Sequence, residues 1–385
     1  MYNKTSVYVA ACLGMAFFGV AFIVMGSVLP DITAKFNLDP VQASSLVTFL
    51  PVGVLLGSLV FGPIVDRFGY RSLLIVSTFI ALSGLMGLSW FNQLNPLRVC
   101  IFMIGFGGGM LNGSTNALAS DLYEGKDRGA KLSILGACYG VGALLIPVLL
   151  SALSGRFTYE AILRGTGFFM LLCIVYFIVI KFPKPKFTQG VPVKQMFKMA
   201  KQPLLLVLSF FLFFQSGLEG LFNNWTTTYL GSAGMLDKED GVLLLSFFVL
   251  GMTVARLILS KLLGTISDFY VLIGGITIVI LGVAGIHYTT GFTASAVSLF
   301  MCGFGLAAGF PIMIGHIGSL HPETSGTAIG LALFIALFGN SLLNYLMGYI
   351  SRYFEIGSFP VFLVILLIMQ LCIVFTNKKS LNTKN

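Results

Sequence analysis

One short stretch, from Gln215 to Trp225, gathers the polar side chains best suited to hold a small solute. Gln215, Glu219 and Asn223 recur at i, i+4 and i+8, so they share one face of a helix. Asn224 and Trp225 follow directly. Amides and carboxylates exchange hydrogen bonds with hydroxyl groups, and an indole ring covers the apolar face of a pyranose. The stretch therefore predicts a binding site for a sugar or a similar polar solute.

Glu219 is the carboxylate that we place near the middle of a membrane-spanning segment. Intramembrane acids are costly and often mark ion pathways, so we expect Glu219 to take up and release a coupling proton. The alternative is a permanent pair between Glu219 and a buried base such as Arg256, which would only hold helices together. Arg256 itself needs an anion and is either a gate element or such a structural partner. Trp225 has a second interpretation as an interfacial anchor.

Other apolar segments carry polar residues that can face the same site. They form two amide pairs at i, i+4, with a tyrosine set between glycines as a weaker candidate. These residues are Asn112 and Asn116, Asn340 and Asn344, and Tyr139. Hydrogen bonds between helices are the alternative role for the amides, and such bonds are common in membranes.

The composition requires a membrane to hold these segments. Of the 385 residues, 57% are hydrophobic and only 10% are charged, against about 25% charged in soluble proteins. The mean hydropathy is +0.95. The net charge of +9 lies in loops that flank apolar runs, which excludes a nucleic-acid partner. The six cysteines are scattered through apolar runs, which argues against a disulfide framework and a metal site, so no cofactor is expected.

Since a spanning helix needs about 20 apolar residues, the chain divides into twelve candidate spans. The expected ranges are 6–29, 41–64, 72–91, 97–119, 131–153, 163–181, 203–229, 241–263, 270–289, 293–314, 326–349 and 357–376. Most lysines and arginines fall on one side of this arrangement, which places both termini in the cytoplasm. The predicted fold is therefore an all-α membrane protein with twelve transmembrane helices.

Two motifs recur along the chain. Gly62–Asp66 is repeated as Gly264–Asp268, and Gly105–Gly107 is repeated as Gly303–Gly305. Matching motifs at nearly equal spacing predict a duplicated unit. We therefore expect two pseudo-symmetric six-helix bundles.

The longest loop separates the two predicted bundles. The expected divisions are an N-terminal bundle at 1–181, a basic cytoplasmic linker at 182–202 and a C-terminal bundle with a short tail at 203–385. In the linker, Lys194, Lys198 and Lys201 share one helical face, which predicts a short helix on an anionic membrane surface. A disordered linker with accidental periodicity is the alternative.

A polar turn between two apolar runs supplies the candidate gate. It contains Gly62, Asp66, Arg67, Gly69 and Arg71, which cannot lie in hydrocarbon and must emerge at a membrane face. Asp66 can accept hydrogen bonds from helix N-terminal amides. The alternative is an ordinary basic loop of the inner face. Asp121 closes the fourth helix on the same side and can pair with Arg67 or Arg71, while Arg256 is the other gate candidate.

The spacing of Gly, Asp, Arg, Gly and Arg in this turn resembles the loop between helices 2 and 3 of the major facilitator superfamily. The resemblance implies twelve helices in two bundles and a turn that holds the cytoplasmic side shut. Two further stretches, Leu111–Asn116 and Gly217–Leu230, resemble the fucose and glucose/galactose proton symporter group. That group has an acid where Asn112 stands and often another in the first helix, and both are missing here.

These patterns together predict a secondary active transporter. We expect it to move a small polar solute, a sugar or sugar derivative, by proton-coupled alternating access in the cytoplasmic membrane, as a monomer. The alternative is a drug or metabolite efflux antiporter, although the Gly-Pro pair typical of exporters is missing from the fifth helix. The sequence has no spaced metal ligands and no catalytic constellation, so an enzyme is not expected.

Overall fold

The structure is a computed structural model. It describes residues 2–38, 40–153, 156–185, 197–232, 238–263, 265–288, 291–378 and 381. The predicted surface helix of the linker is described only in part: Lys194 lies outside the described residues, whereas residues 197–199 are helical. Gly264 of the repeated motif also lies outside the described residues.

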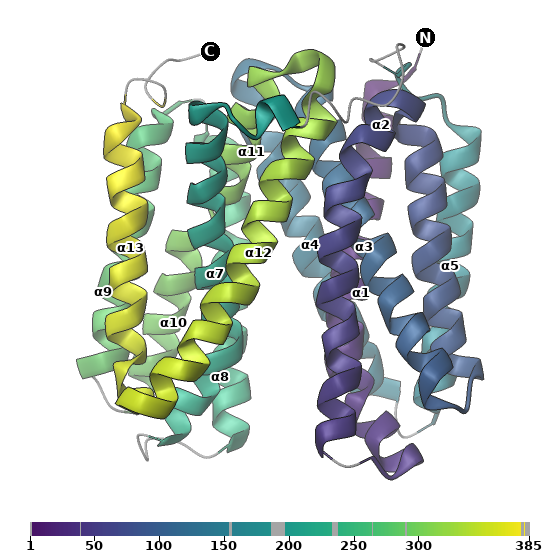
Figure 1. Ribbon diagram of the computed structural model, residues 1–385, viewed down its shortest axis with the longest axis horizontal. Helices are drawn as coiled ribbons and strands as arrows, with labels where there is room; N and C mark the ends of the chain where they lie inside the picture. Colours follow the sequence, from purple (N-terminus) through teal and green to yellow (C-terminus); the bar gives the residue numbers. More distant parts are fainter. Residues whose placement is uncertain are drawn as a thin grey trace. The chain divides into compact units, whose positions relative to one another are not determined.

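The described residues are almost entirely helical (Figure 1). The first helices are α1 (Lys4–Phe36), α2 (Pro40–Trp90), α3 (Leu94–Leu122), α4 (Gly125–Leu153) and α5 (Tyr159–Val179). The later helices are α7 (Pro203–Ser232), α8 (Lys238–Leu262), α9 (Asp268–Tyr288), α10 (Phe292–Leu306), α11 (Gly309–Leu320), α12 (Ser325–Phe354) and α13 (Phe359–Thr376). The predicted all-α class is confirmed.

Helix α2 contains two of the predicted spans. In the described part of the chain, 11 helices are long and apolar enough to cross a membrane, and one of them, Thr48–Trp90, has 43 residues. That length is about twice what a bilayer needs. Gly69 interrupts it with φ 80° and ψ 167°, a backbone conformation that only glycine adopts easily. The break separates the predicted segments 41–64 and 72–91 and accounts for the difference from twelve.

The predicted span 293–314 lies within Phe292–Leu320, which is long and apolar enough to cross a membrane. It is broken between α10 and α11, at Ala307 and Ala308. The Leu306 carbonyl accepts a hydrogen bond from Gln215 Nε2 at 2.7 Å, which satisfies a polar group that the break leaves in the membrane. Gly309 leaves room for this side chain, since a Cβ there would lie 2.4 Å from Gln215 Oε1.

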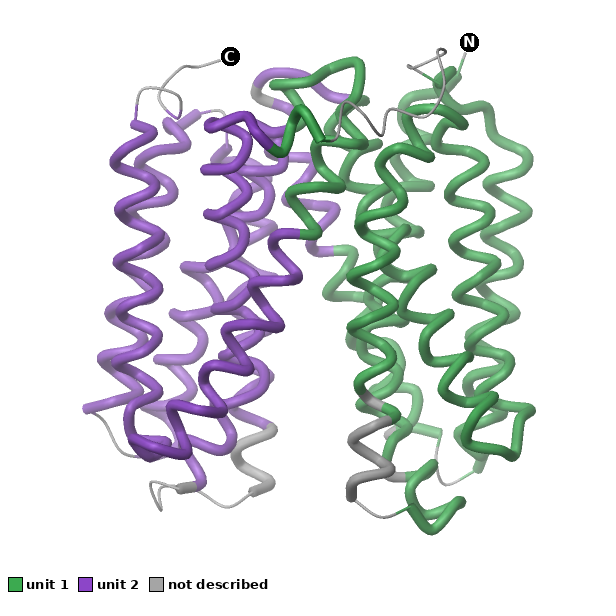
Figure 2. Tube along the Cα trace, viewed as in Figure 1, with its two compact units in different colours: residues 1–122, 138–200, 318–334 green, residues 123–137, 201–317, 335–385 purple. Residues whose placement is uncertain are grey.

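The chain forms two compact units (Figure 2). Unit 1 comprises Met1–Leu122, Cys138–Ala200 and Gly318–Phe334, and unit 2 comprises Tyr123–Ala137, Lys201–Ile317 and Ile335–Asn385. Helices α4 and α12 each contribute one part to either unit. The division into bundles at 1–181 and 203–385 stays a prediction.

The repeat seen in the sequence reappears in the packing inside each unit. In unit 1, a Cβ on Gly105 of α3 would lie 2.2 Å from the Leu50 carbonyl of α2. In unit 2, a Cβ on Gly303 of α10 would lie 1.9 Å from the Phe248 carbonyl of α8, at the same residue offset. Reciprocal contacts follow that offset too: Gly53 with Phe102, and Gly251 with Phe300. Such backbone contact between helices is possible only without side chains, which supports the predicted duplication.

Candidate functional site

The acid of α7 lies at the end of a chain of amide donors in unit 2. Gln215 Nε2 donates to Glu219 Oε1 at 2.9 Å, and Gln370 Nε2 of α13 donates to Gln215 Oε1 at 3.1 Å. Gln215 is only 2% exposed, and Gln370 is fully buried. Each amide therefore directs its positive end toward the carboxylate. Sequence reasoning missed Gln370, although a lone glutamine in the apolar span 357–376 was the available signal.

Arg256 of α8 is the buried base near this acid. It acts electrostatically on Glu219, but the ion pairs with N–O separations within 4.0 Å in the described part of the chain lie elsewhere. Its Nη1 donates to the Gly136 carbonyl of α4 at 2.9 Å, and Ser133 Oγ donates to the Arg256 carbonyl at 2.6 Å. Arg256 Nε is buried with no hydrogen-bond partner among the described atoms. The guanidinium is thus fixed against α4 and attracts Glu219 from beyond contact distance.

Four of the predicted amide and indole residues meet where α7 crosses α12. Asn344 Oδ1 accepts from Asn224 Nδ2 at 3.0 Å and from Trp225 Nε1 at 3.2 Å. Asn344 Nδ2 donates to Asn340 O, and Asn340 Nδ2 donates to Ser216 O at 2.9 Å. These contacts leave Asn224 exposed and Trp225 partly exposed. The cluster Asn224–Trp225–Asn340–Asn344 therefore presents hydrogen-bonding groups and an aromatic ring together.

Asn223 differs from its neighbours. Its side chain is exposed, and its Nδ2 donates to the Glu219 backbone carbonyl at 2.7 Å, one turn earlier in α7. The Asn223 Oδ1 atom therefore lies at the surface of α7, one turn after Glu219.

The predicted polar residues of unit 1 form less extensive contacts. Asn116 Nδ2 of α3 donates to the backbone and side-chain oxygens of Asn112, at 2.8 and 3.0 Å. Tyr139 of α4 packs in an aromatic cluster, with ring centroids 5.3 Å from Phe18 and 6.4 Å from Phe22 of α1. The amide pair bonds within its own helix, and Tyr139 contributes to a mostly apolar wall. Sequence reasoning missed the two phenylalanines, which resemble many others in this chain.

Asp66 of the predicted gate is held at the start of α12, within unit 1. It is 3% exposed and accepts from Gly326 N at 3.1 Å, from Thr327 N at 2.8 Å and from Thr327 Oγ1 at 2.6 Å. A carboxylate at a helix N-terminus satisfies free amides and complements the helix dipole. A Cβ on Gly62 would lie 2.5 Å from the Gly326 carbonyl, which explains the glycine. The expected contact of Asp66 with helix amides is present.

Asp121 of α3 has partners that the sequence did not suggest. It accepts hydrogen bonds from the hydroxyl of Tyr70 and from Ser325 Oγ, the latter at 2.7 Å. Arg71 donates to the Ile178 carbonyl of α5, and the predicted pair of Asp121 with Arg67 or Arg71 stays a prediction. The distance in sequence between Arg71 and Ile178 concealed this contact. Arg67 of the same turn is partly exposed.

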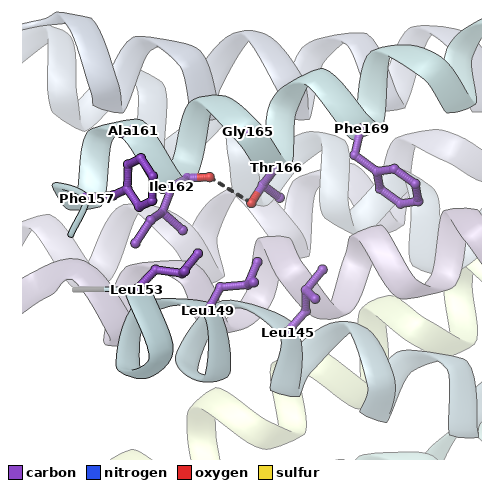
Figure 3. A pocket seen from close by; sticks show the side chains of 9 residues that line it. All are labelled: Leu145, Leu149, Leu153, Phe157, Ala161, Ile162, Gly165, Thr166 and Phe169. Carbon is purple, nitrogen blue, oxygen red and sulfur yellow. Dashed lines mark hydrogen bonds between the residues drawn. The ribbon is translucent and has the colours of Figure 1, made fainter. Parts of the chain in front are cut away.

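A cavity of about 500 Å³ lies between α4 and α5 in unit 1 (Figure 3). Its lining is apolar apart from one hydroxyl: Leu145, Leu149, Leu153, Phe157, Ala161, Ile162, Gly165, Thr166 and Phe169. The Thr166 hydroxyl donates to the Ile162 carbonyl at 3.0 Å and so is already satisfied. The cavity contains no predicted site residue, and its lining residues give a polar solute one side-chain polar atom, the Thr166 oxygen.

The model of one protein family, described as the Major Facilitator Superfamily, matches residues 11–343. The chain belongs to the Major Facilitator Superfamily. It is therefore a multi-pass membrane transporter, and the family resemblance of the Gly62–Arg71 turn is confirmed.

Curated relatives are distant. The chain is 23% identical to the MFS-type transporter YfkL of Bacillus subtilis (strain 168) over 356 residues, covering 87% of this chain and 86% of that one. It is 25% identical to a TsgA homologue of Erwinia tasmaniensis over 217 residues. That match covers 55% of either protein, so the chain spans about half the length of this relative.

Solved structures share the fold at low sequence identity. The fucose:proton symporter FucP of E. coli matches with a TM-score of 0.77 and 15% identity, covering 96% of this chain and 98% of that one. The proton:xylose symporter XylE matches with a TM-score of 0.76 and 14% identity, covering 98% and 95%. Identities this low show a shared fold alone.

Proposed function

We propose that this transporter moves a small polar solute, a sugar or sugar derivative, by proton-coupled alternating access. The observation that carries the proposal is the polar surface of α7 and α12 in unit 2. There Glu219 accepts a hydrogen bond from Gln215, which in turn accepts one from Gln370, and it lies one to two turns from a partly exposed amide and indole cluster. This surface combines a group that can carry a proton with groups that bind hydroxyls and cover a sugar ring.

The amide donors explain how Glu219 can serve as the proton carrier. Gln215 and Arg256 favour the ionised acid, whereas its depth in a membrane span favours the neutral one. An acid under opposing influences of this kind can exist in both protonation states during a transport cycle. Asn223 lies one turn after Glu219, where its Nδ2 donates to the Glu219 backbone carbonyl, and it precedes Asn224 directly.

The contacts of Asp66 and Asp121 provide the proposed inner gate. Both acids bind the start of α12, a segment far along the chain, through backbone amides and hydroxyls. Release of these contacts would free the first turns of α12 from the α2 turn. We propose that the cycle makes and breaks them, with the termini in the cytoplasm and the chain in the cytoplasmic membrane.

The structural relatives agree with a sugar substrate, since FucP and XylE are named as fucose and xylose proton symporters. A second candidate is efflux of drugs or metabolites. It is favoured by 24% identity over 169 residues to the multidrug transporter TPO1_1 of Candida glabrata, which covers 44% of this chain and 30% of that one. Extrusion of lipophilic cations, with no uptake of sugars, would establish this alternative.

The proposal is tested by Glu219→Gln in proteoliposomes. A panel of radiolabelled sugars with and without an imposed pH gradient first identifies the solute for the wild-type protein. The variant keeps a hydrogen-bonding group but cannot ionise, so we expect accumulation against a gradient to be lost while solute exchange continues. Glu160→Gln is the matched control, since Glu160 pairs with Lys35 at a distance of 3.0 Å in unit 1. Unchanged uphill uptake by Glu219→Gln would refute the coupling role.

A further inference from the structure

Two of the six cysteines are in contact, although the sequence separates them widely. Cys12 of α1 and Cys138 of α4 hydrogen-bond through their thiols within unit 1. Both are reduced and partly exposed. The sequence argued against a disulfide framework, and this pair arises only from the crossing of α1 with α4.

The two helices approach closely beside the thiols. A Cβ on Gly142 would lie 1.8 Å from the Ala16 carbonyl, and a Cβ on Gly19 would lie 2.3 Å from the Tyr139 carbonyl. Cys12 precedes Ala16 by one helical turn, and Cys138 precedes Gly142 by one turn. Each thiol therefore lies on the helix face that meets the other helix. Disulfides need Cα atoms within about 7 Å, and this close crossing favours such a separation.

We propose that Cys12 and Cys138 are a modification site that oxidants of the hydroperoxide class convert to a disulfide. In the first step, one thiolate attacks a peroxide oxygen: an S–O bond forms, the O–O bond breaks, and hydroxide leaves. The sulfur becomes a sulfenic acid and the peroxide is reduced. In the second step, the other thiolate attacks this sulfur: the S–S bond forms, the S–O bond breaks, and the departing hydroxide takes a proton to become water.

The position of the bond gives it a structural consequence. Helix α4 passes from unit 2 to unit 1 between Ala137 and Cys138, so Cys138 is its first residue in unit 1. A disulfide would tie that residue to α1, one residue before Tyr139. Oxidation would thus fix α4 at the point where it changes units.

The test counts thiols in membranes that contain the protein. The other cysteines, at positions 100, 173, 302 and 372, are first replaced by serine or alanine. After treatment with hydrogen peroxide, the protein is denatured, labelled with a polyethylene-glycol maleimide and run on a gel. We expect both labels to be lost on oxidation and both to return after dithiothreitol. Retention of both labels under conditions that oxidise a vicinal dithiol peptide would overturn the proposal.

A matched variant tests whether the loss of labels requires the two cysteines to be in contact. Cys138→Ser combined with Val141→Cys moves the thiol to a position on α4 that is 66% exposed. This variant should keep both labels in the same treatment, and equal loss of labels would overturn the proposal. Peptide mapping of the oxidised six-cysteine protein provides a measurement without substitutions. A peptide linked between Cys12 and Cys138 supports the proposal, whereas other linkages alone contradict it.

Discussion

Helix α1 crosses α4 in unit 1, and α7 crosses α12 in unit 2. The offset that relates Gly105 to Gly303 also relates Gly142 of α4 to Asn340 of α12. At the first crossing, Gly142 lets backbones touch, and the surrounding side chains are aromatic rings and thiols. At the second, Asn340 donates to the Ser216 carbonyl, and the surrounding side chains are amides, an indole and an acid.

The comparison shows that two units with the same helix packing can differ in the side chains at equivalent positions. Packing of α2 with α3 and of α8 with α10 is preserved between the units, down to the same glycine contacts. The side chains at the two crossings are not preserved, because amides and an indole bond at the second and aromatic rings pack at the first. The following predictions test this division, from the largest effect to the smallest.

Gly142→Leu should cause the largest loss, because the new side chain collides with backbone atoms of α1 that cannot rotate away. Overpacking costs about 1–3 kcal/mol where side chains can shift, so we expect a loss of folded protein here. The matched control is Gly165→Leu in α5, where a Cβ would meet nothing within 4 Å. Size-exclusion profiles and melting curves in detergent compare the two. If both variants melt alike, the close crossing of α1 and α4 is wrong.

Asp66→Asn should destabilise the protein more than Asp268→Asn, its counterpart in the repeated motif. Asp66 is 3% exposed and has three donors, and hydrogen bonds to a charged group contribute about 1.5–3 kcal/mol. The Asp268 side chain is 30% exposed and pairs with His316 at 2.9 Å, so its loss should cost about 1 kcal/mol or less. Thermal unfolding of both variants measures the order, and a reversed order would contradict it.

Asn224→Ala and Asn344→Ala should each weaken solute binding by about 1–3 kcal/mol. This is the cost of burying a polar group of the bound solute without its hydrogen-bond partner. The two amides are bonded at 3.0 Å, so their effects should not add in the double variant. Binding isotherms for the transported solute provide the measurement. Wild-type affinity in both single variants would remove the α7–α12 cluster from the site.

Tyr139→Phe should have the smallest effect, because the aromatic contacts with Phe18 and Phe22 remain. We expect a loss of solute affinity of about 1 kcal/mol or less, typical of one neutral hydrogen bond. The same binding assay measures it. A loss larger than that of Asn344→Ala would reverse the proposed division between a polar and an apolar surface.

The sequence predicted the features that depend on local spacing. The i, i+4 rows of α7 and α12 lie in helices as expected, whereas Asp66 of the predicted turn lies in helical backbone of α2, which departs from helical geometry at Gly69. For Asn112 and Asn116 the sequence offered a cavity role or hydrogen bonds between helices, whereas Asn116 donates to Asn112 within α3. The roles of these residues in transport remain predictions.

Features that depend on contact between distant segments were not predictable from the sequence. The contact of Gln370 with Gln215 could not be predicted, because the two residues lie on different helices, α13 and α7. The same is true of the contact between Tyr70 of α2 and Asp121 of α3. Hydropathy does not mark the break at Ala307 and Ala308, but Pro311 does, because it has no N–H to donate to the Ala307 carbonyl one turn earlier. The contact that the sequence could not predict is the hydrogen bond from Gln215 of another helix to the Leu306 carbonyl.

The hydrogen bond from Gln215 to the Leu306 carbonyl lies at the break between α10 and α11. A helix without a continuous hydrogen-bond ladder bends more readily at that point than on either side. The amide that bridges the gap, on Gln215, also touches the carboxylate of Glu219. A change of charge on this acid would therefore reach the break between α10 and α11 through a single residue, Gln215.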